Sequence, residues 1–191
     1  MSLSAIPNLL TAFRFMVVPF LLFCLQPGVE EWLALVGFGL FVLGAISDYL
    51  DGFLARRWEV QTSFGKLMDP LADKILITAA LIMLIPMGRV SAVVAFLILA
   101  RELIITGLRG VAASSGLVIA ASGLGKWKTF IQIVALATLM FPLGILPIPH
   151  LHEIGRLILY VALFLTLASG AEYIAKFYKL YTLNPPELKD A

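Results

Sequence analysis

Four aspartates lie close together in the first half of a strongly apolar chain. Asp48 and Asp51 are three residues apart, and Asp69 and Asp73 are four apart. Each pair therefore projects from one face of a helix. Carboxylates that converge repel one another unless a cation lies between them. Oxygen ligands suit hard cations such as Mg²⁺ or Mn²⁺, whose coordination is completed by substrate phosphates. The spacing predicts a divalent metal site that handles phosphates.

Small residues accompany these acids. Gly52 and Ala55 follow Asp51, and Gly65 precedes Asp69 by one helical turn. Without large side chains, a flat base or ribose can approach the backbone closely. Arg56 can donate to phosphate oxygens in a forked geometry. Two other interpretations stay open: the glycine serves helix packing, or the aspartates form an ion-pair network with the neighbouring basic residues Arg56, Arg57, Lys66 and Lys74.

The elements that must position these residues are membrane helices. Of the 191 residues 61% are apolar and 14% are charged, and the mean hydropathy is +0.99. Soluble domains carry about 25% charged residues, so the composition excludes a soluble protein. A span needs roughly 20 apolar residues. We predict a single all-α, polytopic membrane domain over residues 1–191, with six transmembrane helices at about 9–26, 32–54, 67–87, 90–112, 125–146 and 154–175.

Lysine and arginine predict the orientation. With six spans, both termini and the loops after the second and fourth spans share one side, and only Arg89 and Arg156 fall on the other. Cytoplasmic loops are rich in Lys and Arg, so both termini are predicted to be cytoplasmic. The aspartates then lie at the cytoplasmic ends of helices 2 and 3. A short polar loop joins these helices, so they are antiparallel neighbours. No nucleic-acid partner is expected.

The stretch from residue 48 to residue 73 resembles the signature of the CDP-alcohol phosphotransferase family. It reads D-Y-L-D-G-F-L-A-R, eight residues, then G-K-L-M-D-P-L-A-D, which fills every fixed position of D-x-x-D-G-x-x-A-R-x8-G-x3-D-x3-D. The resemblance implies that Asp48, Asp51 and Asp69 bind two divalent cations. It implies that Asp73 is the general base and also touches a metal. It further implies a pocket for the CDP-lipid lined by Asn8, Thr11, Gly52, Ala55, Arg56, Thr62 and Gly65.

Other stretches resemble the bacterial branch of this family whose acceptor is glycerol 3-phosphate. They include residues 6–11, 68–74, 100–102, 108–109 and 125–129. Cations on the fourth and fifth helices are predicted to bind the acceptor phosphate, namely Arg101, Arg109, Lys126 and Lys128. The alternatives are that the lysines only flank a span, or that Arg101 is neutralised by Glu102 or Glu172.

The expected reaction moves a phosphatidyl group from CDP-diacylglycerol to glycerol 3-phosphate and gives phosphatidylglycerophosphate and CMP. The resemblance also implies the bacterial cytoplasmic membrane as location, contact with the lipid bilayer and a homodimer. Inositol phosphate, serine or phosphatidylglycerol are alternative acceptors for the same chemistry. An ion-coupled transporter is the alternative from another class, because carboxylates in membrane helices also line cation paths.

Overall fold

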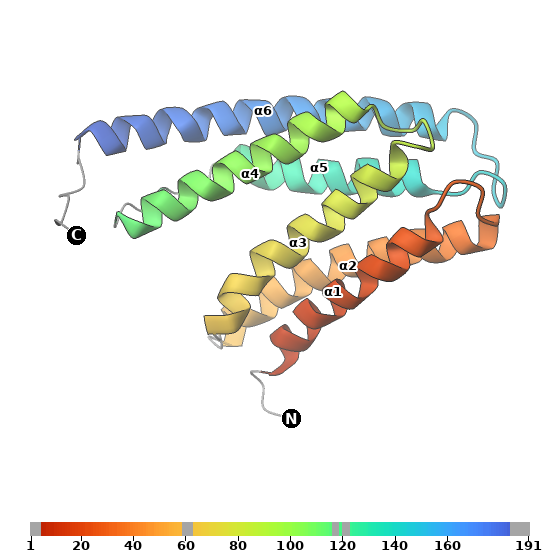
Figure 1. Cartoon of the computed structure of the whole chain (residues 1–191), viewed down its shortest axis with the longest axis horizontal. Helices are drawn as coiled ribbons and strands as arrows, with labels where there is room; N and C mark the ends of the chain where they lie inside the picture. Colours follow the sequence, from red (N-terminus) through yellow and green to blue (C-terminus); the bar gives the residue numbers. More distant parts are fainter. Residues whose placement is uncertain (1–4, 59–62, 116–118, 120–122, 184–191) are drawn as a thin grey trace.

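The computed structural model describes residues 5–58, 63–115, 119 and 123–183, and within these ranges the side chains of 5–11, 49, 51–58, 63–70, 73, 126 and 183 lie outside the description. Six helices and no strand occur in these ranges (Figure 1). The helices are α1 (Ala5–Cys24), α2 (Glu31–Trp58), α3 (Ser63–Leu84), α4 (Ala92–Ser114), α5 (Gly123–Met140) and α6 (Leu151–Leu183).

The all-α prediction is confirmed, and each predicted span coincides with one helix. The largest difference is α6, which has 33 residues and extends beyond the predicted 154–175 at both ends. Within the described residues, two helices are long and apolar enough to cross a membrane: Glu31–Asp48 in α2 and Leu151–Thr182 in α6. Shorter apolar stretches occupy Ala12–Cys24 and Lys74–Leu84. The six-span topology stays a prediction.

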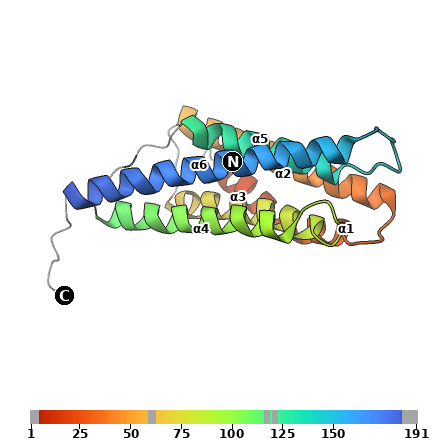
Figure 2. The same cartoon turned by 90° about the horizontal axis from the view of Figure 1, so that it is seen from above.

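The helices run back and forth between two ends of the molecule. The connections from α1 to α2, from α3 to α4 and from α5 to α6 lie at one end, on the right in Figures 1 and 2. The end of α2, the start of α3 and the C-terminal end of α6 lie at the other. Helix α1 packs against α2 and α3, and α6 packs against α4 and α5. The predicted antiparallel pairing of α2 and α3 is confirmed.

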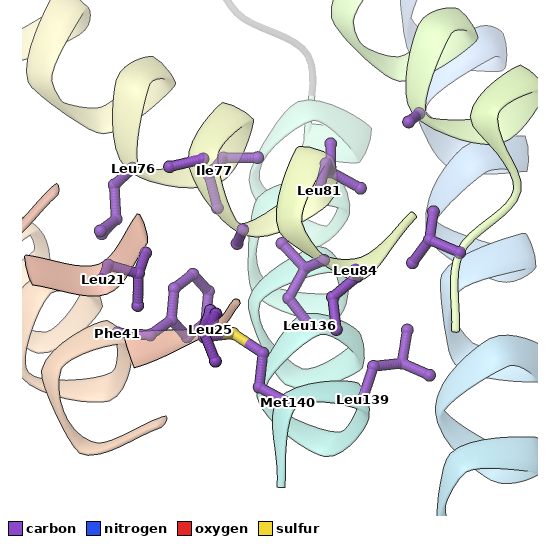
Figure 3. Packing of buried hydrophobic residues seen from close by; sticks show 14 of the residues in the cluster. Leu21, Leu25, Phe41, Leu76, Ile77, Leu81, Leu84, Leu136, Leu139 and Met140 are labelled. Carbon is purple, nitrogen blue, oxygen red and sulfur yellow. The ribbon is translucent and has the colours of Figure 1, made fainter. Parts of the chain in front are cut away.

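The core lies where α1, α2, α3 and α5 meet (Figure 3). Leu21, Phe41, Leu81, Leu136 and Met140 are completely buried there. Many equally large apolar side chains face outward instead, among them Phe96, Leu103, Leu157 and Phe164, each about two-thirds exposed or more. An apolar exterior of this extent is typical of a protein that contacts lipid or another apolar partner.

Gly44 allows α2 to approach α3 closely. A Cβ at this position would lie 2.9 Å from Cδ2 of Leu76 on α3. Gly39, five residues earlier on α2, has nothing within 4 Å of a Cβ built on it. The two helices that carry the aspartates thus pack closely at Gly44. Asp48 follows one turn later and lies on the same side of α2.

Candidate active site

The four aspartates come from the adjoining ends of α2 and α3. Asp48 and Asp51 belong to the later part of α2, and Asp69 and Asp73 to the first turns of α3. The side chains of Asp51, Asp69 and Asp73 lie outside the described part. Among the side chains that are described, no three His, Cys, Asp or Glu residues form a group able to hold a metal. The predicted metal site therefore stays a prediction, and Asp48 is the member whose surroundings can be given.

Asp48 is bound by an arginine from the first helix. Arg14 on α1 is completely buried, and its Nη1 donates to Oδ1 of Asp48. The Asp48 side chain stays one-third exposed. Asn8 and Thr11 precede Arg14 by two turns and one turn of α1, and their side chains lie outside the description. Our sequence interpretation gave Arg14 no contact with the acids.

A cavity of about 190 Å³ opens between α3, α4 and α5. Its α3 wall begins at Lys74, the residue after Asp73, and continues one turn later through Ile77 and Thr78. Helices α4 and α5 form the rest of the wall, with the lining residues Leu99, Glu102, Leu103, Lys128, Thr129 and Gln132. Most of the polar lining residues carry a charged or an amide group, although the helices around the cavity are otherwise largely apolar.

Glu102 is the centre of an ion network at this cavity. Its Oε1 accepts a hydrogen bond from Nζ of the buried Lys128 on α5, and one from Nη1 of Arg101 at 3.1 Å. Arg101 continues to α6, where Nη2 donates to Oγ of Ser169 at 2.8 Å. A buried cation is destabilising unless a carboxylate neutralises it. Glu102 therefore holds charged groups of α4 and α5 at the cavity and, through Arg101, links them to α6.

Arg101 lies against a glycine. A Cβ on Gly170 of α6 would lie 3.0 Å from Nε and 3.1 Å from Cγ of Arg101. A larger residue at this place would force the Arg101 side chain to move by a few tenths of an ångström. The arginine is thereby fixed both by hydrogen bonds and by packing.

The four cations predicted for the acceptor phosphate have different surroundings. Lys128 lines the cavity. Arg101 reaches the cavity wall through Glu102, which confirms that a local carboxylate pairs with it. Arg109 lies two turns further along α4, with its guanidinium carbon 5.8 Å from the centre of the Tyr173 ring. The side chain of Lys126 lies outside the described part. Their role in acceptor binding stays a prediction.

Several cavity residues were absent from our predicted site: Lys74, Glu102, Thr129 and Gln132. Glu102 had a recognisable sign in the sequence, because an acid in the middle of an apolar helix is costly and usually marks a site. We considered it only as a partner for Arg101. Gln132 and Thr129 have no such sign, because polar uncharged residues occur in many membrane helices.

Comparison with known proteins adds the family. A family model described as CDP-alcohol phosphatidyltransferase matches residues 4–168. The chain belongs to this family. The match includes α1 to α5 and the first half of α6, so it contains both the aspartate helices and the cavity. The resemblance seen in the signature between residues 48 and 73 is thus confirmed, and the protein is a CDP-alcohol phosphatidyltransferase-type enzyme.

Curated relatives extend along nearly the whole chain. A protein of Rickettsia felis is 39% identical over 177 residues, which are 92% of this chain and 97% of the relative. A protein of Bacillus subtilis is 37% identical, with 90% and 94% covered. One from Haemophilus influenzae is 35% identical, with 88% and 91% covered. All three are named CDP-diacylglycerol–glycerol-3-phosphate 3-phosphatidyltransferase.

The predicted CDP-pocket residues that are fixed positions of the signature fall in the same two helices, while Asn8 and Thr11 belong to α1. Gly52, Ala55 and Arg56 belong to the last turns of α2, and Gly65 to the first turn of α3. Thr62 lies in the short connection outside the described residues. Gly52, Ala55, Arg56 and Gly65 thus lie on the helical segments that carry the aspartates, and their contact with a nucleotide stays a prediction.

Proposed function

We propose that this protein transfers the phosphatidyl group of CDP-diacylglycerol to glycerol 3-phosphate, releasing CMP and forming phosphatidylglycerophosphate. The observation that carries this proposal is the complete aspartate signature of α2 and α3. Curated relatives that are named for this activity align with about nine-tenths of this chain and of their own length. The family supplies the reaction type, and the relatives supply the acceptor.

The donor side of the proposed site is formed by α1, α2 and α3. Asp48, Asp51 and Asp69, with a further contact from Asp73, would hold two Mg²⁺ or Mn²⁺ ions, for which four carboxylates without nitrogen or sulfur ligands are a suitable donor group. When bound, such ions neutralise the diphosphate and the charge that develops on the departing CMP. Arg14 keeps the Asp48 carboxylate in place. The CDP-lipid would contact Asn8, Thr11, Gly52, Ala55, Arg56, Thr62 and Gly65.

The acceptor would occupy the cavity between α3, α4 and α5. Its volume of about 190 Å³ suits a three-carbon phosphomonoester and is small for a nucleotide diphosphate. Lys74 and Lys128 bring positive charge to the wall, while Thr129 and Gln132 offer hydrogen-bonding groups for hydroxyls. The remaining predicted cations, Arg101, Arg109 and Lys126, would contribute through the Glu102 network and from the rim on the side of the aspartates.

The chemical step depends on how α3 joins the two sides. Asp73 belongs to the aspartate group, and its neighbour Lys74 lines the cavity. An acceptor hydroxyl at the cavity edge would therefore be near Asp73 and opposite the donor diphosphate. Asp73 would take the proton of this hydroxyl as its oxygen attacks the β-phosphorus in line. Because an aspartate is a weak base at neutral pH, orientation of the two substrates supplies much of the acceleration.

The proposed setting is the bacterial cytoplasmic membrane, with six spans, both termini cytoplasmic and two copies of the chain in a homodimer. The apolar exterior and the two long apolar helices support contact with a bilayer. The concentration of Lys and Arg on the side of the aspartates supports the orientation. The homodimer is proposed from the resemblance to the family.

One experiment tests the function directly. Purified protein would be given CDP-diacylglycerol, Mg²⁺ and one acceptor at a time: glycerol 3-phosphate, inositol phosphate, serine or phosphatidylglycerol. We expect CMP release with glycerol 3-phosphate and its loss when a chelator removes the metal. Release with another acceptor alone would keep the chemistry and change the substrate. No CMP release with any acceptor would reject the proposal and return the ion-coupled transporter as a candidate.

A further inference from the structure

Two arginines line one small pocket at the end of the molecule opposite to the aspartates. The pocket lies between the α3–α4 connection, the start of α4 and the first turns of α6, on the right in Figure 1. It has a volume of about 20 Å³ and is lined by Arg89, Val90, Ser91, Val94, Arg156, Leu159 and Tyr160. The reaction proposed above uses none of these residues.

The pocket carries a surplus of positive charge. Arg89 donates from Nη1 to the carbonyl oxygen of Leu139 at 2.8 Å, which fixes its guanidinium near the end of α5. Glu31 acts electrostatically on Arg89 without an ion pair between them among the described contacts. Arg156 is exposed, and the described ion pairs do not include it. Among the described residues, the pocket lining contains both arginines and no carboxylate, and both guanidinium groups act electrostatically on His152.

Hydroxyl groups complete the polar wall. Ser91 is the residue before the first turn of α4, and its side chain makes no capping hydrogen bond to that helix. Tyr160, which is 56% exposed, also lines the pocket. Guanidinium and hydroxyl donors around one opening form the group of contacts that binds phosphate oxygens.

An apolar strip leads away from the pocket along α6. Arg156, Tyr160 and Phe164 follow one another at four-residue spacing, so they share one side of this helix. Phe164 is 70% exposed, and the adjacent Leu157 is 67% exposed. Helix α4 runs beside α6 from the same end and exposes Phe96 by 68%. A molecule with its phosphate at the arginines would therefore have apolar side chains beneath it for its tails.

We propose that this pocket binds the phosphate of an anionic membrane phospholipid whose acyl chains lie along the exposed apolar side chains of α4 and α6. The small volume admits phosphate oxygens and not a whole hydrated ion, so the tails supply much of the binding. A headgroup without an ammonium is preferred, because two guanidinium groups repel a choline. The bound lipid belongs to the leaflet opposite to the aspartates.

Native mass spectrometry of the full-length protein tests this proposal, with dioleoylphosphatidylglycerol and dioleoylphosphatidylcholine as probes. We expect the wild type to retain one more phosphatidylglycerol than the variant Arg89→Gln/Arg156→Gln, whose affinity should fall about tenfold. The matched control is Lys176→Gln/Lys179→Gln, which removes two cations from the other end of α6 and should not change this lipid. A second lipid in the active site would remain in the double variant and is thus distinguished.

Three results would overturn the proposal: equal retention by the wild type and the double variant, equal retention of the two lipids, or release of the lipid by excess inorganic phosphate, which would assign the pocket to a free anion. CMP release of the double variant should stay at the wild-type value, because the pocket is remote from the aspartates. If loss of the Arg89 contact with Leu139 impairs folding, Arg156→Gln alone decides, since Arg156 is exposed.

Discussion

Arg14 on the first helix donates a hydrogen bond to the carboxylate of Asp48 on the second, and its own side chain is completely buried. The contact joins residues that are 34 positions apart in the chain. Asp48 is the first aspartate of the signature, so the first helix orients a proposed metal ligand. We expect this pair to be as important to metal binding as the ligands' own spacing.

Replacing Arg14 should weaken metal binding. In Arg14→Gln the Asp48 carboxylate loses its charged donor, and we expect the metal concentration for half-maximal CMP release to rise by about 10–100-fold. A titration with Mn²⁺ measures this. Lys176→Gln, which breaks the exposed pair with Glu172, is the control and should leave the titration unchanged. An unaltered metal dependence in Arg14→Gln would show that Asp48 is not a ligand or needs no support.

Asp73→Asn tests the assignment of the proton acceptor. The amide cannot accept the proton of the attacking hydroxyl, and we expect turnover to fall by about 10²–10⁴-fold. The Mn²⁺ titration should change much less than in Asp48→Asn, because Asp48 is assigned to metal binding and Asp73 mainly to proton transfer. Normal single-turnover CMP release in Asp73→Asn would remove this residue from the chemical step.

Glu102→Gln should affect the acceptor and spare the donor. Lys128 and Arg101 both lose the Glu102 carboxylate, so the position of these cations and the balance of charge at the cavity change. We expect KM for glycerol 3-phosphate to rise roughly tenfold, while KM for CDP-diacylglycerol stays constant. Glu102→Asp should recover part of the loss.

Glu153→Gln is the matched control for this prediction. It removes a carboxylate from the exposed pair with His150 at the first turn of α6, at the end opposite to the aspartates, and both KM values should remain unchanged. A lowered melting temperature in Glu102→Gln with an unaltered KM for glycerol 3-phosphate would show that the network only stabilises the fold.

Two glycine substitutions should have opposite effects on stability. The Cβ of Gly170→Ala would lie 3.0 Å from Nε of Arg101, whose guanidinium is held at both ends. We expect a loss of about 1–3 kcal/mol. Gly107→Ala on α4 has nothing within 4 Å of its Cβ and should gain up to about 1 kcal/mol from helix propensity. Thermal denaturation in detergent compares the two, and equal shifts would mean that Arg101 moves aside freely.

The helices were predictable because each one is a long apolar stretch between turn residues. The breaks at Pro27-Gly28 and Pro86-Met87-Gly88 correspond to the ends of α1 and α3. Gly28 and Gly88 both adopt positive φ there, at 83° and 66°. The end of α6 was predicted too early, because Lys176 and Lys179 reduce hydropathy without breaking a helix. Charge lowers the tendency to enter a membrane, while helix propensity stays high.

The candidate site was predictable only where it is local. The aspartates of α2 and α3 stand at helical spacings that can be read directly from the sequence. Contacts that depend on tertiary packing could not be read in this way: the Arg14–Asp48 pair, the position of Glu102 between Lys128 and Arg101, and the accommodation of Arg101 by Gly170. Each of these joins helices whose relative rotation is decided by the packing of the whole bundle.

The cavity borders the aspartate helices at α3 and is otherwise built by α4 and α5. Different helices therefore carry most of the two functions. The aspartates of α2 and α3 would activate the CDP-lipid, and the cavity wall from α4 and α5 would select the acceptor alcohol. Substitutions in α4 and α5 can alter the choice of alcohol without disturbing the aspartates. Related chains could make different products through substitutions in α4 and α5 while they keep the same reaction. At Asp73 and Lys74 a substitution would have to remain compatible with both activation of the donor and selection of the acceptor.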